Sequence, residues 1–222
     1  CFIRTYNKND FKKKNFLETS KVDSIISPIK RLNDSIYKQP NVMILVMESF
    51  GREYIGAFNK NRSIKDYISY TPFLDSLSNN SLIFTNAFAN GRQSIEALPS
   101  ILASVPSFKV PFTSSPYSNQ KIQSLVSVFK EKGYSTSFFH GAPNGSMGFL
   151  GLSNILGFDN YYGKNEFNDN SLYDGYWGIW DEPFLQFVNS QTSKLKEPFF
   201  STFFSLSSHE PFYVPDQYEG VF

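Results

Sequence analysis

Cysteine, an excess of charge and long apolar runs are all scarce in this sequence. Cys1 is the only cysteine among 222 residues, so no disulfide can form within the chain. The 21 basic and 20 acidic residues give a net charge of +1. This balance provides no electrostatic reason to expect a nucleic-acid partner. The longest uninterrupted apolar run, residues 42–47, is far shorter than the ~20 residues that span a bilayer.

The first 40 residues are polar, with basic clusters at residues 12–14 and 30–31. We interpret residues 1–40 as an N-terminal arm or juxtamembrane linker. A solvated arm without a membrane role fits the same pattern. For either interpretation of the arm, we expect membrane association to come from segments upstream of Cys1. Aromatic residues make up 18% of the chain, which suits a large buried core.

Strand and helix patterns alternate along the rest of the chain. Strands are predicted at residues 41–47, 82–88, 134–139 and 198–206; helices are predicted to begin at Pro72 and to cover residues 94–104, 122–132 and 182–195. This alternation predicts an α/β fold with a mainly parallel sheet. The first strand is apolar throughout, which is typical of a central strand buried on both faces. Helical spacing places Leu125, Val126 and Phe129 on an inward face.

Three predicted strands end in chemically capable side chains: Glu48, His140 and His209. The chain has only two histidines, and both follow strands. Ligands of open α/β sheets bind beyond the carboxyl ends of the strands, so parallel strands would gather these three residues at one edge. The alternative is that they are polar only because loops are exposed.

Glu48 directly follows a buried strand, where a carboxylate must be paired, act as a cap or bind a metal. Spacing alone favours a cap near Arg52. Ser94 follows a turn at Gly91 and falls in the first turn of a predicted helix, where the helix N-terminus stabilises an alkoxide or an anionic ester. An ordinary capping serine is the alternative.

Six segments occur in a distinctive order: NVMILVMESFG at 41–51, TPFLDSL at 71–77, FTNAF at 84–88, GRQSIEALPSILASVP at 91–106, FHG at 139–141 and SSHEPF at 207–212. In this order they resemble the sulfatase-like branch of the alkaline phosphatase superfamily, most closely the lipoteichoic acid synthase or phosphoglycerol transferase group. The resemblance implies that residues 41–222 are the N-terminal portion of an alkaline phosphatase-like catalytic domain, a mainly parallel sheet with helices on both faces.

The resemblance also implies roles for individual residues. Glu48 matches the metal-binding glutamate, and Ser94 matches the nucleophile that also touches the metal. His140 and His209 match histidines near the substrate headgroup. Trp177, in the segment WGIWDE, would line the substrate cleft, whereas Trp180 and Asp181 are expected to be structural. Arg92 would bind an anionic oxygen, although a solvated loop arginine fits equally. The implied cofactor is a divalent cation: Mn, Mg, Zn or Ca.

Three departures from the family pattern limit these roles. The family takes further metal ligands from a late Asp-His pair, and no Asp-His dipeptide occurs here; we therefore expect a C-terminally incomplete domain that binds metal weakly and is inactive alone. Ser94 is not followed by the x-P-x-R pattern of formylglycine sulfatases, which favours direct attack by its hydroxyl. The Trp and Arg that follow the first histidine in glycerol-phosphate polymerases are also missing, and Asn144 is expected to form a turn there.

These features predict an extracytoplasmic, metal-dependent hydrolase or transferase that acts on phosphate or sulfate esters at the outer face of the membrane. Its partner would be an anionic lipid headgroup or a glycan ester. A sulfuric ester hydrolase of the arylsulfatase type and an inactive sulfatase-like binding domain remain the alternatives.

Overall fold

The computed structural model describes residues 15–26, 38–59, 65, 67–107 and 110–220. The chain divides into two units, residues 1–39 and 40–222. In the first unit, the described residues form helix α2 (Thr19–Ile25), which has no buried residue. The rest of the arm predicted for residues 1–40 lies largely outside the described residues. No helix in the described part of the chain is both long and apolar enough to cross a membrane.

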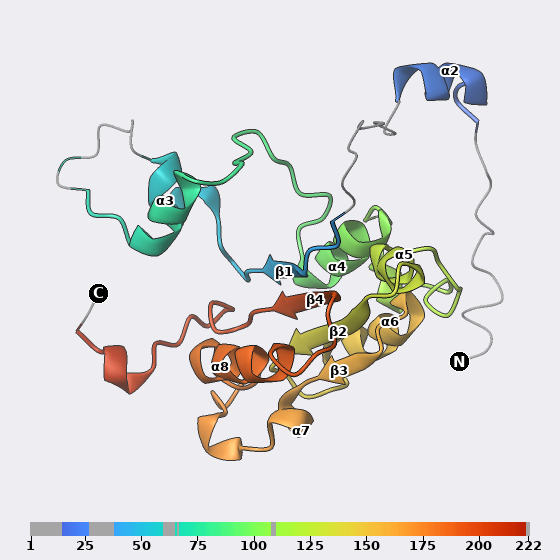
Figure 1. The fold of residues 1–222 in the computed structure, drawn as a ribbon. Coiled ribbons are helices and arrows are strands. Elements are labelled where there is room, and N and C mark those ends of the chain that lie inside the picture. Colours follow the sequence, from blue (N-terminus) through green and yellow to red (C-terminus); the bar gives the residue numbers. More distant parts are fainter. Residues whose placement is uncertain (1–14, 27–37, 60–64, 66, 108–109, 221–222) are drawn as a thin grey trace. The chain divides into compact units, whose positions relative to one another are not determined.

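The second unit is built on a parallel four-stranded sheet (Figure 1). Its strand order is β1-β4-β2-β3, with bounds Val42–Val46 for β1, Phe199–Phe204 for β4, Ser135–His140 for β2 and Asn160–Tyr162 for β3. All three neighbouring pairs run parallel. The prediction of an α/β fold with a mainly parallel sheet is confirmed for the described residues.

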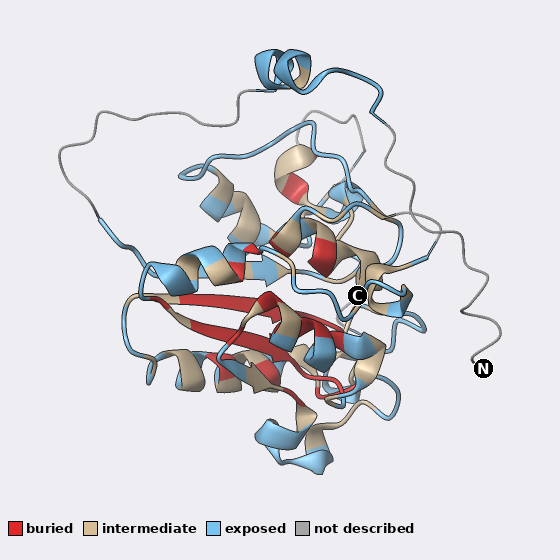
Figure 2. Ribbon diagram, turned by 90° about the vertical axis from the view of Figure 1, so that its right-hand side faces the viewer, coloured by how far each residue is buried: buried red, intermediate tan, exposed pale blue. Residues whose placement is uncertain are grey.

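Helices cover both faces of this sheet (Figure 2). One face packs against α4 (Ser94–Ala103), α5 (Leu125–Glu131) and α6 (Phe149–Leu156). The other packs against α8 (Asp181–Thr192), with the short α7 (Lys164–Phe167) beside it. The remaining α-helix of this unit is α3 (Pro72–Ser78); short 3-10 turns include Arg52–Tyr54, Gly56–Phe58, Phe112–Ser114, Ser146–Gly148, Asn170–Leu172 and Asp216–Tyr218.

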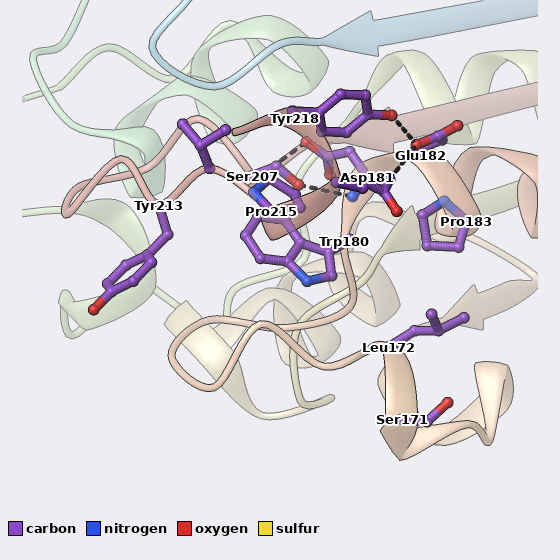
Figure 3. A pocket seen from close by; sticks show the side chains of 12 residues that line it. Ser171, Leu172, Trp180, Asp181, Glu182, Pro183, Ser207, Tyr213, Pro215 and Tyr218 are labelled. Carbon is purple, nitrogen blue, oxygen red and sulfur yellow. Dashed lines mark hydrogen bonds between the residues drawn. The ribbon is translucent and has the colours of Figure 1, made fainter. Parts of the chain in front are cut away.

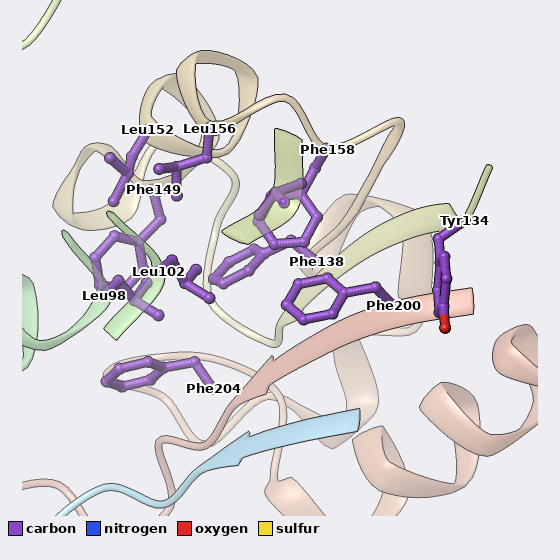
Figure 4. Close-up of a cluster of buried hydrophobic side chains, with 11 residues drawn as sticks. Leu98, Leu102, Tyr134, Phe138, Phe149, Leu152, Leu156, Phe158, Phe200 and Phe204 are labelled. Carbon is purple, nitrogen blue, oxygen red and sulfur yellow. The ribbon is translucent and has the colours of Figure 1, made fainter. Parts of the chain in front are cut away.

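The two cores follow from the alternation of side chains along the strands. Phe138 and Phe200 point into the core beneath α4, α5 and α6 (Figure 4). Phe139 directly follows Phe138 in β2, and Phe203 comes three residues after Phe200 in β4. Both point into the core beneath α8. All four side chains are at most 1% exposed. A strand with phenylalanine on both faces is therefore suited to the middle of a two-sided sheet.

Three predictions about the elements are wrong. β1 is an edge strand, not a central one: among the described residues it pairs only with β4, its burial alternates, and Leu45 is 56% exposed. Residues 82–88 form no strand, and Leu82 and Phe88 are 83% and 93% exposed. Alternation alone does not form a strand when no neighbouring strand supplies hydrogen bonds. Leu125, expected to face inward, is 42% exposed, since α5 begins at this residue.

Candidate active site

The carboxyl ends of the strands meet in register at one edge of the sheet. Phe204 at the end of β4 lies opposite Val46 of β1 on one side and His140 of β2 on the other. Glu48 follows two residues after Val46. Its backbone N–H donates a 2.7 Å hydrogen bond to Oγ of the buried Ser205. Glu48 and His140 are therefore brought to the same sheet edge, as the sequence predicted.

Ser94 and Glu48 form the closest polar contact at this edge. Ser94 Oγ donates to Glu48 Oε2 at 2.5 Å, a length typical of a hydroxyl bound to a carboxylate. Ser49 also donates to Glu48, through a 3.2 Å bond to Oε1. The backbone of Ser49 has φ = 53°, a left-handed conformation that is costly for a residue other than glycine and is often found at functional sites.

Glu96 does the capping at the start of α4 that spacing alone assigned to Ser94, and no side chain among the described residues caps the 3-10 turn Arg52–Tyr54 that follows Glu48. Helix α4 begins at Ser94, and the Glu96 carboxylate accepts the backbone N–H groups of Arg92 and Gln93 at 2.8 and 3.3 Å. A hydrogen bond from Ser107, followed by the one from Arg92, lowers the pKa of Glu96. The Ser94 hydroxyl is consequently available to Glu48. A glycine at 91 suits the close approach of α4, because a Cβ there would lie 2.6 Å from Glu96 Cβ.

Arg52 does not pair with Glu48. Its Nη1 donates instead to the carbonyl oxygen of Thr85 at 2.6 Å, and its guanidinium lies over the Phe58 ring. Arg92 is exposed, and its side chain makes no hydrogen bond or ion pair with the described residues. The structure therefore brings Glu48 and Ser94 together. The guanidinium of Arg92, two residues before Ser94, has no partner among the described residues.

His140 is fully buried at the end of β2. Its Nδ1 lies 3.0 Å from the carbonyl oxygen of Phe204, and because a carbonyl can only accept, Nδ1 carries the proton. Nε2 is buried and has no partner among the described residues. Burial lowers the pKa of His140 to about 4, against the opposing effects of the Phe204 hydrogen bond and the Glu48 charge. The imidazole is thus neutral at pH 7, with an acceptor lone pair on Nε2.

Trp177 and His209 form a second pair. Their ring centroids are 4.1 Å apart. The Glu210 carbonyl accepts the Trp177 indole N–H at 2.8 Å and lies 2.9 Å from His209 Nδ1. The loop before Trp177 is held by Asp174, whose Oδ1 accepts the backbone N–H groups of Tyr176, Trp177 and Gly178. No hydrogen bond or ring contact within the described residues joins this pair to Ser94 or Glu48.

The residue that ties the second pair to the fold is Asp181, at the start of α8. Its carboxylate accepts the backbone N–H groups of Leu206 and Ser207 at 2.8 to 3.1 Å, while its own N–H donates to Ser207 Oγ at 2.7 Å. Burial raises its pKa, opposed by these hydrogen bonds. Sequence reasoning assigned Asp181 a structural part but not this link, since its partners lie 25 and 26 residues away.

Asn144 does not reach the candidate site. Its side-chain amide donates to both Glu166 carboxylate oxygens at 3.0 Å, and residues 144–145 form a turn, as predicted. In the described part of the chain, no three His, Cys, Asp or Glu side chains gather into a metal-binding cluster. Glu48 and Ser94 nevertheless offer two adjacent oxygen donors, the ligand type that hard divalent cations prefer.

Comparison with known proteins agrees with this geometry. The sequence profile of the sulfatase family matches residues 40–222. The chain belongs to the sulfatase family. Over 208 residues it is 22% identical to a lipoteichoic acid synthase-like protein, YvgJ of Bacillus subtilis (strain 168), covering 86% of this chain and 32% of that protein.

Two solved structures share the fold of this sulfatase-family chain. One, a protein of the alkaline phosphatase superfamily from Vibrio parahaemolyticus, has a TM-score of 0.71 and 25% identity; the match covers 81% of this chain and 43% of that one. The other, the lipoteichoic acid synthase LtaP from Listeria monocytogenes, has a TM-score of 0.68, with the same identity and coverage. These likenesses confirm the sulfatase-like branch and the lipoteichoic acid synthase group. The chain spans about a third of the curated relative and under half of the solved chains.

Proposed function

We propose that this domain is the catalytic part of a metal-dependent transferase or hydrolase that acts on phosphate esters of the phosphoglycerol type. The observation that carries the proposal is the 2.5 Å hydrogen bond from Ser94 Oγ to Glu48 Oε2, at the N-terminus of α4 and the carboxyl edge of the sheet. Such a pair resembles an activated nucleophile, in which a neighbouring group polarises a hydroxyl that is weak when free.

Glu48 and Ser94 would hold the cation, whose identity among Mn, Mg, Zn and Ca is open. A bound divalent cation supplies positive charge that lowers the pKa of a hydroxyl and offsets developing negative charge. Glu48 accepts a short, charge-assisted hydrogen bond from the Ser94 hydroxyl. Ser94 stands in the first turn of α4, and the N-terminus of a helix favours an anionic ester there.

The proposed reaction has two steps. Ser94 Oγ attacks phosphorus, an Oγ–P bond forms and the P–O bond to the leaving group breaks; the hydroxyl proton passes through Glu48 Oε2 to the departing oxygen, which leaves as an alcohol. A water molecule or an acceptor alcohol then attacks the same phosphorus, the Oγ–P bond breaks, and the proton of the attacking hydroxyl returns to Ser94 Oγ. Splitting one displacement into two is the general advantage of covalent catalysis.

His140 and Arg92 would contact different parts of the headgroup. Nε2 of the neutral His140 is an acceptor without a partner among the described residues, so it suits a hydroxyl rather than an anionic oxygen. Because this atom is buried, a substrate hydroxyl would have to displace side chains that cover it. Arg92, whose side chain has no partner among the described residues, lies two residues before Ser94 and suits an anionic oxygen. Trp177 and His209, whose rings are in contact, would line the part of the substrate site that holds the rest of the headgroup. A hydroxyl beside a phosphate is the chemistry of a glycerol phosphate headgroup.

Such a substrate belongs to the outer face of a membrane. We therefore propose an extracytoplasmic location for the domain and membrane association through segments upstream of Cys1. The names of the relatives, lipoteichoic acid synthase-like YvgJ and the lipoteichoic acid synthase LtaP, support a lipid-linked phosphoglycerol substrate over a free sulfate ester.

The test is the variant Ser94→Ala in the full-length protein, assayed in parallel with phosphodiester and sulfate-ester substrates. Turnover should fall to background on phosphodiesters, and wild-type protein should hydrolyse sulfate esters far more slowly. Retained turnover would rule out Ser94 as nucleophile, and faster sulfate hydrolysis would support the arylsulfatase alternative. Ser100→Ala is the matched control, because this α4 serine donates only to backbone carbonyls.

A further inference from the structure

A cleft of about 470 Å³ opens beside the N-terminus of α8 (Figure 3). The start of α8 forms one wall, and residues 213–218, which end in the 3-10 turn Asp216–Tyr218, form another. Its volume falls within the ~300–1,000 Å³ typical of small-molecule pockets. Neither Glu48 nor Ser94 lines it, so the cleft is a separate feature from the nucleophile.

Three aromatic residues, Trp180, Tyr213 and Tyr218, are among the residues that line the cleft. Trp180 is half-buried in the middle of the cleft, and Figure 3 shows Tyr213 on one side of it and Leu172 on the other. Tyr213 is 54% exposed and is held by Tyr176: the rings stack with centroids 4.9 Å apart, and the Tyr176 hydroxyl donates to the Tyr213 hydroxyl at 3.3 Å. Rings supported in this way form a rigid surface for a flat, partly apolar ligand.

The polar groups of the cleft are acceptors and neutral donors. Oε2 of Glu182 accepts from the Tyr218 hydroxyl and, at 3.4 Å, from Gln217 Nε2. Oε1 of Glu182 and the indole N–H of Trp180 have no hydrogen-bond partner within the described part of the chain. Both are therefore available to a ligand, one as an acceptor and the other as a donor.

The charge of the cleft argues against an anionic ligand. Among the described residues that line it, Asp181 and Glu182 are acidic, and none is lysine, arginine or histidine. Asp181 uses both carboxylate oxygens on backbone N–H groups, which leaves Glu182 as the charge that faces a ligand. A phosphate would be repelled by this carboxylate, whereas hydroxyl groups would donate to it.

We propose that this cleft binds a neutral sugar unit. A sugar ring combines an apolar face, suited to Trp180 and Tyr213, with hydroxyl groups suited to Glu182 and the indole N–H. Trp180, Ser207 and Tyr213 also border the recess at Trp177 and His209. The identity of the sugar rests on the proposed function. The sugar would be the glycosyl part of a substrate or acceptor, and the ester of that molecule would lie toward His209.

Tryptophan fluorescence of the 222-residue chain tests this directly, because Trp177 and Trp180 are its only tryptophans. A neutral disaccharide such as maltose should change the emission saturably, and the change should persist in Trp177→Phe, where only Trp180 reports. Glu182→Ala should weaken binding about tenfold, as expected for loss of a hydrogen bond to a charged group. Tyr213→Leu should weaken it by a similar factor through loss of stacking.

Glu131→Ala is the matched control, since it removes an exposed carboxylate from α5 and should leave the affinity unchanged. Thermal unfolding would verify that Glu182→Ala and Tyr213→Leu remain folded. Absence of a saturable change with maltose overturns the proposal. Preferential binding of glycerol phosphate or choline at Trp180, or equal effects of Glu182→Ala and Glu131→Ala, overturns it as well. Binding is measured without turnover, so it is independent of the Ser94→Ala result.

Discussion

The hydroxyl of Ser94 lies 2.5 Å from the carboxylate of Glu48, although 46 residues separate them in the chain. One residue begins a helix and the other follows a strand, and the two elements meet only through the packing of α4 on the sheet. This pair is the centre of the proposed chemistry, and its affinity for a divalent cation can be measured.

Glu48→Gln should strongly reduce turnover while leaving the fold intact, since Glu48 is only half-buried and glutamine keeps its shape. We expect a loss on the order of 10²–10⁴ in rate, the contribution of a positioned charged group. Calorimetric titration of the 222-residue chain with Mn²⁺ or Zn²⁺ should show weak binding that Glu48→Gln abolishes. Tight, stoichiometric binding to the chain would contradict the expectation that two ligands alone hold the metal loosely.

His140 should make stability depend on pH. Its pKa of about 4 in the folded state lies below the ordinary value of 6.5, so between these values the unfolded chain binds a proton that the folded chain does not. Stability from this residue is fully present above pH 6.5 and is lost as the pH falls toward 4, by about 3 kcal/mol in total.

Urea unfolding at pH 7, 6, 5 and 4 would measure this dependence. His140→Asn, which cannot titrate in this range, should have a flatter profile than the wild type. Identical profiles for the two proteins would show that His140 is accessible to protons in the folded state.

Asp181→Ala should destabilise the domain by about 2–4 kcal/mol, because it leaves the backbone N–H groups of Leu206 and Ser207 without their acceptor. Since these groups lead into the segment that carries His209, KM for the substrate should rise as well. Chemical unfolding and steady-state kinetics would measure both effects. Glu219→Ala, at an exposed acidic residue, is the control and should change stability by no more than about 0.5 kcal/mol. Equal effects of the two variants would disprove the link.

Leu45 and Phe203 are register partners with opposite environments. Leu45 on the edge strand is 56% exposed, whereas Phe203 is fully buried against α8. Phe203→Ala should cost about 3–5 kcal/mol, as for other buried phenylalanines, and Leu45→Ala should cost less than about 1 kcal/mol. Urea denaturation would compare them. A large cost for Leu45→Ala would mean that β1 is covered in solution.

Several features of the fold were predictable from local sequence. The strands ending at His140 and before His209, and the helix beginning at Ser94, all follow from patterns whose cause lies within a few residues: side-chain alternation, the Gly91 turn and the spacing of apolar residues. The family resemblance then pointed to Glu48 and Ser94, where local physics alone favoured caps.

Local patterns failed where neighbours decide the outcome. The apolar run at residues 42–47 suggested a central strand, but hydrophobicity does not specify how many strands lie beyond an edge. Residues 82–88 alternate like a strand and yet have no partner strand among the described residues. In both places the local sequence does not specify whether another strand lies alongside the segment.

The sequence by itself determined which residues are able to react and at which strand or helix ends they stand, because alternation and helical spacing are properties of the local chain. The tertiary structure alone decided that Ser94 donates to Glu48 rather than capping its own helix, that Asp181 holds the turn before His209, and that Trp180 and Tyr213 line one cleft. Each of these contacts joins segments far apart in the chain, and only the packing of helices on a sheet brings such segments within hydrogen-bond distance.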